Sequence, residues 1–555
     1  MRRAARAAAL ALLAACSSAK PAAGPAPAAL PKTRAESSGY TETSHYMDVI
    51  AFLDSLQKLK VPMYRTVLGT STEGREIPVV ILSRPQVRSA AEAKALHRPI
   101  VWVQGNIHSN EVEGKEALQA LIRDLATHAG PNVLDSIVLI AVPIYNPDGN
   151  EKFAVQAVNR PEQNGPEMIG EGTNGQGLNL NRDYMKQEAP ETRAEFALFD
   201  SWGADVFMDL HTTDGSFHGY ALTYAPSLSP DAFFTAPYTR DSVLPWLRAV
   251  MKSRHGYLTY DYGNFSTEYN GDRLTDTIKA GWFTYDARPR FGTNYFGVAG
   301  RVTVLAEGYS HDPFDVRVSS MYAFVSEVLS YVGAHGAQIT ALSRRADSTV
   351  TAWGANPASA PPIALRSALA RSPVDDTVIA EDLVATGDSS LTQPGVPRGL
   401  KRTGHYRAQV MPVWVAFKPV ATNTLPYAYA VPAADTAVVR VLRGHGIRIE
   451  PLPQRWVTVV QRYLVDSVRH AERPFQGHHE TTIHGRWTEA LDTLPAGTVL
   501  VETAQPLGLV AFYLLEPEAD DGLVDWNFFD AWLAPGKPYP VARIPGAIGT
   551  LKEPR

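Results

Sequence analysis

The sequence contains very little cysteine, which excludes several kinds of site. Cys16 is the single cysteine among 555 residues, so the chain can form no intramolecular disulfide and no metal site built from several thiolates. A surplus of positive charge is also lacking, because 57 acidic residues outnumber 52 basic ones. This balance argues against a general nucleic-acid-binding protein, which carries basic stripes. Catalytic chemistry in this chain must therefore rest on histidine, aspartate, glutamate and arginine.

The apolar run at the N-terminus is short. Ala7–Ala15 follows an arginine-rich start and is too short to span a bilayer as a permanent helix. It ends in Leu-Ala-Ala-Cys at Cys16, which resembles a bacterial lipobox. We therefore expect residues 1–15 to be a lipoprotein signal peptide that is removed before Cys16 is lipidated. A plain signal peptide followed by an incidental cysteine is the alternative.

The segment that follows Cys16 is rich in alanine and proline. This composition predicts a flexible tether over residues 16–38. A lipid on Cys16 would hold the folded part of the protein at a membrane surface without burying any of it. The predicted location is therefore the bacterial cell envelope, with the protein lipid-anchored on a periplasmic or outer-membrane face.

The rest of the chain has the composition of an ordinary globular protein, with 45% hydrophobic and 20% charged residues. Over residues 39–340, short apolar runs alternate with segments of helical periodicity, which predicts an α/β fold with a parallel or mixed sheet. Residues 341–373 are rich in Ser, Ala and Pro and are predicted to be a linker. Residues 374–555 are predicted to form a smaller β-rich α+β domain, and their pattern does not indicate a function.

Polar side chains follow three of the predicted strands. His108 and Glu111 come after an apolar run and precede a predicted helix. His211 and Glu307 each end a later apolar run. Because ligands in open α/β sheets bind beyond the carboxyl ends of the strands, we expect one shared site. His108 and Glu111 can converge on one point and supply two of the three protein ligands of a catalytic zinc, although a solvated histidine beside an acid is the commoner meaning of this spacing.

Five motifs occur in a characteristic order along residues 39–336. They are His-x-x-Glu at His108 and Glu111, Asn-Pro-Asp-Gly at 146–149, Asn-Arg at Asn181 and Arg182, a strand-ending His211 and a strand-ending Glu307. In this order they resemble the motifs of the zinc metallocarboxypeptidase family, the carboxypeptidase A-like peptidases. The resemblance implies an α/β/α fold with a mixed sheet, one zinc ion per chain and hydrolysis of the C-terminal peptide bond of peptides. The C-terminal region lies outside it.

The resemblance implies a metal-binding or proton-transfer role for four residues. His108, Glu111 and His211 would bind zinc, which lowers the pKa of a coordinated water to about 7. Glu307 would be the general base, since an acid directly after an apolar strand is costly to bury unless it has a partner or a function. A packed histidine and a structural salt bridge are the ordinary alternatives for His211 and Glu307.

The resemblance also implies substrate contacts. Asn181 and Arg182 match the pair that binds the free carboxylate of the last residue, which a planar guanidinium can hold in two parallel hydrogen bonds. Arg160 falls near the family's arginine that polarises the scissile carbonyl and stabilises the developing oxyanion. The tyrosine that closes over the substrate matches Tyr285 by spacing and Tyr295 by its Asn-Tyr-Phe-Gly context, and both assignments stay open.

The sequence departs from the family pattern near one ligand. Asn179 stands where the family often has an acid that orients a ligand histidine, and an amide oxygen can still accept a hydrogen bond from imidazole. Asp209, two residues before His211, is a candidate for an orienting acid or a strand cap. The large C-terminal region is the other departure.

Two other functions are compatible with these residues. A peptidoglycan-trimming peptidase or an amide deacylase would use the same zinc and base on a different substrate. A non-catalytic envelope lipoprotein would keep the fold only to bind ligands. The first hypothesis remains a zinc carboxypeptidase whose partner is a peptide with a free C-terminal carboxylate, and no nucleic acid is expected to bind.

Overall fold

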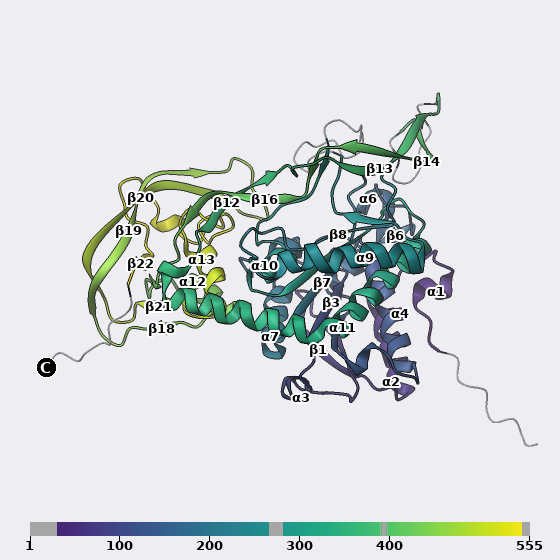
Figure 1. The fold of residues 1–555 in the computed structure, drawn as a ribbon, viewed down its shortest axis with the longest axis horizontal. Helices are drawn as coiled ribbons and strands as arrows, with labels where there is room; N and C mark the ends of the chain where they lie inside the picture. The colour runs from purple at the N-terminus through teal and green to yellow at the C-terminus, as the bar shows by residue number, and fades with distance from the viewer. Residues whose placement is uncertain (1–29, 266–280, 389, 391–395, 397, 547–555) are drawn as a thin grey trace, which may run out of the picture.

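The computed structural model describes residues 30–265, 281–388, 390, 396 and 398–546. The predicted signal peptide (1–15), Cys16 and most of the predicted tether lie outside these ranges. In Figure 1, the described residues among 30–340 lie on one side, and we call them the catalytic part after the prediction for this region. Most of residues 363–546, the C-terminal part, lie on the other side, and a long helix, α11 (Phe314–Ala355), runs along both. Within the described ranges, no helix is both long enough and apolar enough to cross a membrane.

An eight-stranded mixed sheet forms the centre of the catalytic part. Its strands are β1 (Tyr64–Thr70), β2 (Glu76–Leu82), β3 (Ile100–Gly105), β4 (Val138–Val142), β7 (Val206–Thr212), β8 (Leu222–Ala225), β9 (Thr259–Asp261) and β11 (Val302–Gly308). They lie in the order β1-β2-β4-β3-β7-β11-β8-β9. The four central strands β4, β3, β7 and β11 run parallel. Strands β1 and β2 pair antiparallel with their neighbours, and β8 is antiparallel to β11 and parallel to β9. The predicted α/β class with a mixed sheet is confirmed.

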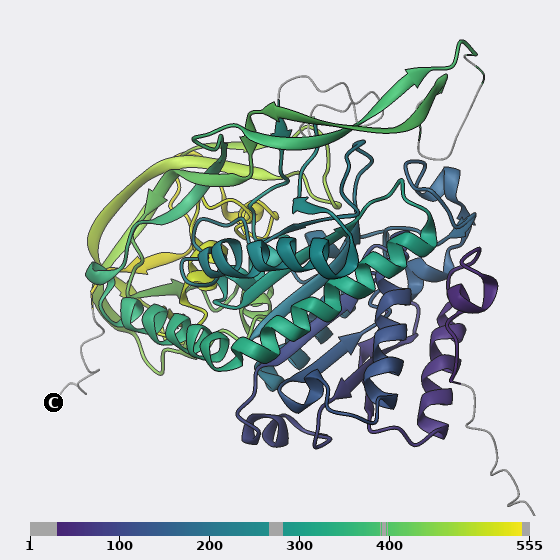
Figure 2. The same cartoon turned by 45° about the vertical axis from the view of Figure 1, so that its right-hand side comes forward.

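Helices cover both faces of this sheet, which explains why the central strands β3, β4, β7 and β11 are buried along their whole length. In β3, Val101 and Val103 face one hydrophobic layer, and Ile100 and Trp102 face the other. The first layer is completed by helices α2 (Tyr46–Lys58), α4 (Glu113–Thr127), α9 (Leu244–Val250) and α11. The second layer is completed by α3 (Ala90–Ala95), α7 (Pro190–Trp202) and α10 (Gly292–Val298). Figure 2 shows α11 and its neighbours in front of the sheet.

Shorter elements complete the catalytic part. They are α1 (Arg34–Ser38), α5 (Pro147–Glu151), α6 (Gln156–Asn159), α8 (Thr235–Tyr238), β5 (Ala154–Val155), β6 (Met168–Ile169) and β10 (Trp282–Phe283). Helix α1 lies within the segment predicted to be tether. Thr33 and Glu36 form a reciprocal capping box at its start, and Ala35 is fully buried. The tether prediction is therefore wrong for residues 34–38.

The predicted linker at 341–373 is also wrong. Helix α11 continues through it to Ala355, and β12 (Ile363–Ala370) follows soon afterwards. Alanine is the best helix former, so an Ala- and Ser-rich composition is compatible with helix as well as with linker. The buried side chains of Ile339, Ala346 and Val350 lie on one face at helical spacing. Burial of this face, with Ile339 in the first layer of the catalytic part and Val350 in the cluster that includes the C-terminal part, explains why the segment is helical.

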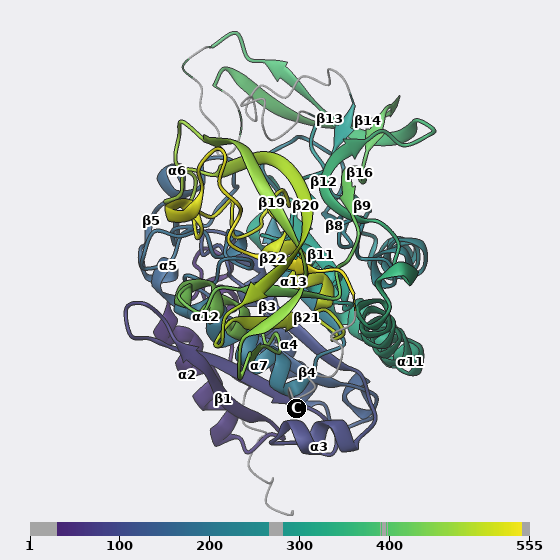
Figure 3. The same cartoon turned by 90° about the vertical axis from the view of Figure 1, so that its left-hand side faces the viewer.

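The C-terminal part is β-rich, as predicted. Its elements are β12, β13 (Asp376–Ala385), β14 (Leu400–Met411), β15 (Val413–Trp414), β16 (Ala416–Asn423), β17 (Ala428–Val431), α12 (Thr436–Gly444), β18 (Glu450–Pro451), β19 (Trp456–His470), β20 (Thr481–Leu494), β21 (Val499–Glu502), α13 (Gly508–Leu515) and β22 (Ala542–Ile544). Six strands form an antiparallel sheet in the order β18-β21-β17-β22-β19-β20. Figure 3 shows the long β19–β20 hairpin curving across this sheet.

The two parts share one hydrophobic core. Phe296 of α10, Val350 of α11, Tyr429 of β17 and Phe512 of α13 belong to the same buried cluster. Strand β10 of the catalytic part also pairs with β15 of the C-terminal part. The C-terminal part is therefore packed directly onto the catalytic part and is not a separately tethered domain.

Candidate active site

Three adjacent strands bring the predicted metal ligands together. His108 lies just after β3, His211 lies near the end of β7, and Glu307 of β11 is paired with His211 in the parallel register. Glu111 follows His108 by one turn, because its backbone amide bonds the carbonyl of His108. One ligand atom from each of His108, Glu111 and His211 lies within 4.8 Å of the other two. The sheet therefore assembles the triad that the sequence predicted.

The donor atoms of this triad suit a zinc ion. Nδ1 of His108 lies 3.1 Å from Oε1 of Glu111, and Nδ1 of His211 lies 2.9 Å from Oε2 of the same carboxylate. Donors bound tetrahedrally to one zinc ion at its usual bond lengths are about 3.3 Å apart. Small shifts of these side chains would thus place two nitrogens and one oxygen around a single ion.

The outer nitrogens of both histidines face oxygen atoms. Nε2 of His108 lies 2.9 Å from Oδ1 of Asn179, and Nε2 of His211 lies 2.9 Å from Oδ2 of Asp209. Oxygen partners favour a proton on Nε2 and leave the lone pair of Nδ1 for a metal. Asn179 and Asp209 therefore occupy the orienting positions considered for them from the sequence.

Charge within the triad is balanced by its neighbours. Burial alone would raise the pKa of Glu111, but His108, Arg160 and His211 lower that pKa well below its usual value. Burial would lower the pKa of His211, but the carboxylates of Asp209 and Glu111 raise it well above its usual value. Glu111 is therefore held as a carboxylate, the form that binds a metal.

Arg160 lies beside the metal ligands. Its guanidinium donates to Oε1 of Glu111 at 2.8 Å and to the carbonyl oxygens of Thr212 and Thr213 at 2.6 and 3.0 Å. Burial would lower its pKa, but Glu111 and the acids around it raise that pKa, so the group stays charged. The structure thus places a fixed positive charge at the position where the resemblance expects one.

Glu307 lines the same pocket and is 8% exposed. Burial raises the pKa of its carboxyl well above the usual value, and the charge of Glu111 adds to this effect, whereas His211 opposes it. This carboxyl is buried, unlike that of a surface acid, and lies at the edge of the triad. It is therefore suited to exchange a proton with a reacting molecule.

Asn181 and Arg182 follow Asn179 in the chain, and Nδ2 of Asn181 lies 3.4 Å from Nε2 of His211. Asn181 is held by the backbone amide of Gly292, which donates to its Oδ1 at 3.0 Å. The guanidinium of Arg182 stacks over the ring of Phe291 at 4.1 Å and donates to the carbonyl of Asn181 at 2.9 Å. Both side chains line the pocket that contains the triad. Their predicted role in binding a substrate carboxylate stays a prediction.

The structure separates the two tyrosine candidates. Tyr285 lines the pocket, and its hydroxyl lies 2.9 Å from Oγ1 of Thr293. Tyr295 is 2% exposed in the shared core, and its hydroxyl lies 2.8 Å from Nδ1 of His445. A ring packed in that core cannot close over a substrate, so the assignment of Tyr295 is wrong and Tyr285 keeps the role as a prediction.

One residue near the metal centre was not found from the sequence. The backbone amide of Asn179 donates a hydrogen bond to Oε1 of Gln476 at 2.7 Å. Gln476 lies in the loop between β19 and β20, in the C-terminal part. No motif marks this glutamine, because its contact joins residues that are 297 positions apart.

Comparison with known proteins agrees with this site. Residues 49–292 match the zinc carboxypeptidase family. Carboxypeptidase 2 of Trichophyton tonsurans is 26% identical over 492 residues, which are 85% of this chain and 81% of that protein. This similarity reaches into the C-terminal part. Carboxypeptidase D of Mus musculus is 34% identical over 131 residues, which are 22% of this chain and 8% of that protein.

A metallo-carboxypeptidase structure from Burkholderia cenocepacia is 20% identical and covers 53% of this chain and 70% of its own, with a TM-score of 0.38. The family match spans His108, Glu111, Arg182 and His211, and the structure joins these residues in one pocket with Glu307. On these grounds, residues 49–292 and the site that they carry are similar to the zinc carboxypeptidase family.

Proposed function

We propose that this protein is a zinc-dependent carboxypeptidase that removes the C-terminal residue of peptides. The observation that carries the proposal is the convergence of three kinds of group in one pocket of about 330 Å³. The metal triad, Glu307 and Arg182 all line this pocket. A scissile bond beside the triad can therefore belong to the same molecule as a carboxylate at Arg182.

Each residue of the site has its own chemical role in the proposed reaction. Zinc, when bound by His108, Glu111 and His211, supplies Lewis acidity and lowers the pKa of a water. Glu307 takes the proton from the attacking water and hands it to the leaving amine. Arg160 presents positive charge where negative charge develops on the carbonyl oxygen.

Selection of the chain end rests on Arg182. A guanidinium matches a carboxylate in geometry and charge, and stacking on Phe291 restricts the orientation of this one. A peptide whose last residue is amidated would offer this cation no negative charge. The proposal therefore requires that a free terminal carboxylate increases the rate of hydrolysis.

A matched pair of peptides tests this function. The two peptides share one sequence and end in a free carboxylate or in an amide, and release of the last residue is followed with the zinc-loaded protein. The proposal expects cleavage of the free peptide only. Equal cleavage of both peptides would favour the amide deacylase, and cleavage of peptidoglycan stem peptides alone would favour the trimming peptidase. One zinc per chain with no hydrolysis of any peptide would favour the ligand-binding lipoprotein.

We also propose that the enzyme is lipid-anchored at the bacterial envelope through Cys16. The Leu-Ala-Ala-Cys motif after a short apolar run supports this proposal. The full chain and a Cys16→Ser variant would be compared in cells fed a labelled fatty acid. The label and the membrane association should be present in the full chain and lost in the variant; label or membrane association in the variant would overturn the proposal.

A further inference from the structure

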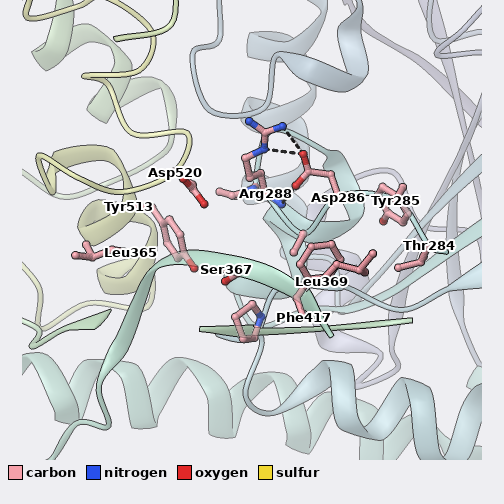
Figure 4. Close-up of a pocket in the computed structure, with 13 residues that line it drawn as sticks. Thr284, Tyr285, Asp286, Arg288, Leu365, Ser367, Leu369, Phe417, Tyr513 and Asp520 are labelled. Carbon is pink, nitrogen blue, oxygen red and sulfur yellow. Dashed lines mark hydrogen bonds and ion pairs between the residues drawn. The ribbon is translucent and has the colours of Figure 1, made fainter. Parts of the chain in front are cut away.

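A second cavity, also of about 330 Å³, lies between the two parts of the molecule. We call it the interdomain cavity. It is lined on one side by residues 284–289 of the catalytic part and on the other by residues of β12, β16 and α13 (Figure 4). Tyr285 lines both this cavity and the catalytic pocket. None of the roles described above involves the other residues that line the interdomain cavity.

The walls of the interdomain cavity are largely apolar. Leu365 and Leu369 lie on one face of β12, because alternate residues of a strand point to the same side. Phe417 is the neighbour of Leu369 in the paired strand β16. Ala287 and Pro289 complete the wall on the catalytic side. Such a surface suits a hydrocarbon chain.

The charged groups of the cavity are not balanced. Asp286 and Arg288 neutralise each other, since Nε of Arg288 donates to Oδ2 of Asp286 at 2.6 Å and its backbone amide donates to Oδ1 at 2.9 Å. The third charged residue is Asp520, and Figure 4 shows its carboxylate directed toward the cavity. With one cation and two anions, the lining has a net negative charge.

The cations near Asp520 are shared with other acids. Arg290 is bound to the carboxylate of the adjacent Asp521. Arg288 and Arg366 line a smaller cavity with Asp520, but Glu480 and Glu518 line it too, and Arg366 lies 3.5 Å from Glu518. Burial raises the pKa of Asp520 to about 6 and the charge of Asp521 adds to this effect, whereas Arg288 and the backbone amide of Ser367 lower that pKa. Acids therefore outnumber cations around Asp520, which favours a positively charged ligand there.

We propose that the interdomain cavity binds an alkylammonium group, with its aliphatic chain against Leu365, Leu369 and Phe417 and its positive end at Asp520. An anionic ligand fits less well, because the edge of Arg288 that carries Nε is already occupied by Asp286. Two sources have this chemistry, namely the lysine side chain of a bound peptide and a free aliphatic amine. Binding of the group itself does not depend on the proposed peptidase activity.

Direct binding of n-hexylammonium tests the proposal. Titration calorimetry on the metal-free full chain would compare this probe with n-hexanol, which has the same chain and no charge. We expect the ammonium to bind roughly tenfold more tightly, the contribution of one hydrogen-bonded charge. Asp520→Asn should remove this difference while it retains an oxygen near the Ser367 amide. Equal affinities of the two probes, or an unchanged difference in Asp520→Asn, would overturn the proposal.

Two further variants separate binding in the cavity from other effects. Asp466→Asn removes the same charge from an exposed position on β19 and should leave binding unchanged; an equal loss there would mean that total charge alone attracts the probe. Leu369→Arg places a tethered cation in the cavity and should abolish binding. Persistent binding in a Leu369→Arg protein with wild-type circular dichroism would contradict the assigned location.

Enzyme kinetics distinguishes the two possible sources of the ammonium group, a lysine of a bound peptide and a free aliphatic amine. This step rests on the proposed function. If the ligand is a peptide side chain, n-hexylammonium should compete with lysine-containing peptides, and these should have a lower KM than their norleucine counterparts. If it is a free amine, inhibition should be noncompetitive with both peptides. Absence of any hydrolysis would reject the peptidase function, whereas the calorimetric result for the cavity would stand by itself.

Discussion

Gln476 and Asn179 are joined by a hydrogen bond that links the C-terminal part to the metal centre. The backbone amide of Asn179 donates to Oε1 of Gln476, and Oδ1 of Asn179 faces Nε2 of His108. The loop that carries Gln476 is itself fixed, because Nε2 of His478 lies 2.9 Å from a carboxylate oxygen of Glu188. The C-terminal part therefore helps to orient a zinc ligand.

Gln476→Ala should weaken zinc binding. Loss of the acceptor frees the backbone of Asn179 and, with it, the partner of His108. Groups that orient metal ligands contribute about 10- to 100-fold to metal affinity, and we expect a loss of roughly tenfold here, since Gln476 acts through a second residue. Competition with a chromophoric chelator would measure the affinity.

Two variants control for this effect. Gln476→Glu retains an acceptor oxygen and should restore most of the zinc affinity. Gln461→Ala makes the same change on β19, where the side chain hydrogen-bonds Glu489 at the surface. This variant should leave the zinc affinity unchanged. Wild-type zinc affinity in Gln476→Ala would show that the contact does not position the ligand.

Glu307→Gln should abolish turnover and leave zinc bound, because Glu307 is not a member of the triad. Removing a positioned general base costs about 10²- to 10⁴-fold in rate, and the amide cannot accept the proton. His108→Ala should instead lose the metal. Zinc content by elemental analysis and kcat would be measured for both proteins. Loss of zinc from Glu307→Gln would contradict a role limited to proton transfer.

Arg182→Ala should raise KM for peptides with a free C-terminus by roughly 10- to 100-fold, the contribution of hydrogen bonds to a charged group. Arg182→Lys should recover part of this loss, since it restores charge but not the two parallel bonds. Initial rates with the free peptide would give KM for each variant. An unchanged KM in Arg182→Ala would remove this residue from substrate binding.

The positions of residues that end an apolar run could be predicted from the sequence. His211 and Glu307 each end an apolar run, and strands that run parallel place such ends at one edge of the sheet. The sequence order and the types of residue therefore sufficed for the grouping of the triad and for the mixed sheet, and the role of Glu307 as the base stays a prediction.

Residues placed by distant contacts could not be predicted in this way. Spacing favoured Tyr285 and local context favoured Tyr295, and a contact with His445, 150 residues away, places Tyr295 in the core. The helical state of residues 341–355 depends on burial of Val350 in a core shared with the C-terminal part. Composition reports neither contact, so the linker and one tyrosine were misassigned.

Asp231 joins the catalytic part to two elements of the C-terminal part. The hydroxyl of Tyr513 donates to its Oδ2 at 2.6 Å, and the amide of Ala364 donates to the same oxygen at 3.0 Å. Burial raises the pKa of Asp231 to about 7, although both hydrogen bonds lower it. The folded state therefore binds this proton more tightly than the unfolded chain, in which an aspartate has a pKa of about 3.9.

Asp231→Asn should make the stability of the protein less sensitive to pH. Because the folded pKa is raised, the stabilising effect of this proton is fully present below about pH 4 and is lost as the pH rises to about 7. The asparagine carries no titratable proton and can still accept from Tyr513. Between about pH 5 and pH 8, the wild-type melting temperature should therefore fall relative to that of Asp231→Asn. The exposed Asp466→Asn protein should follow the wild type, and parallel melting curves for all three proteins would show that Asp231 is not protonated in the folded state.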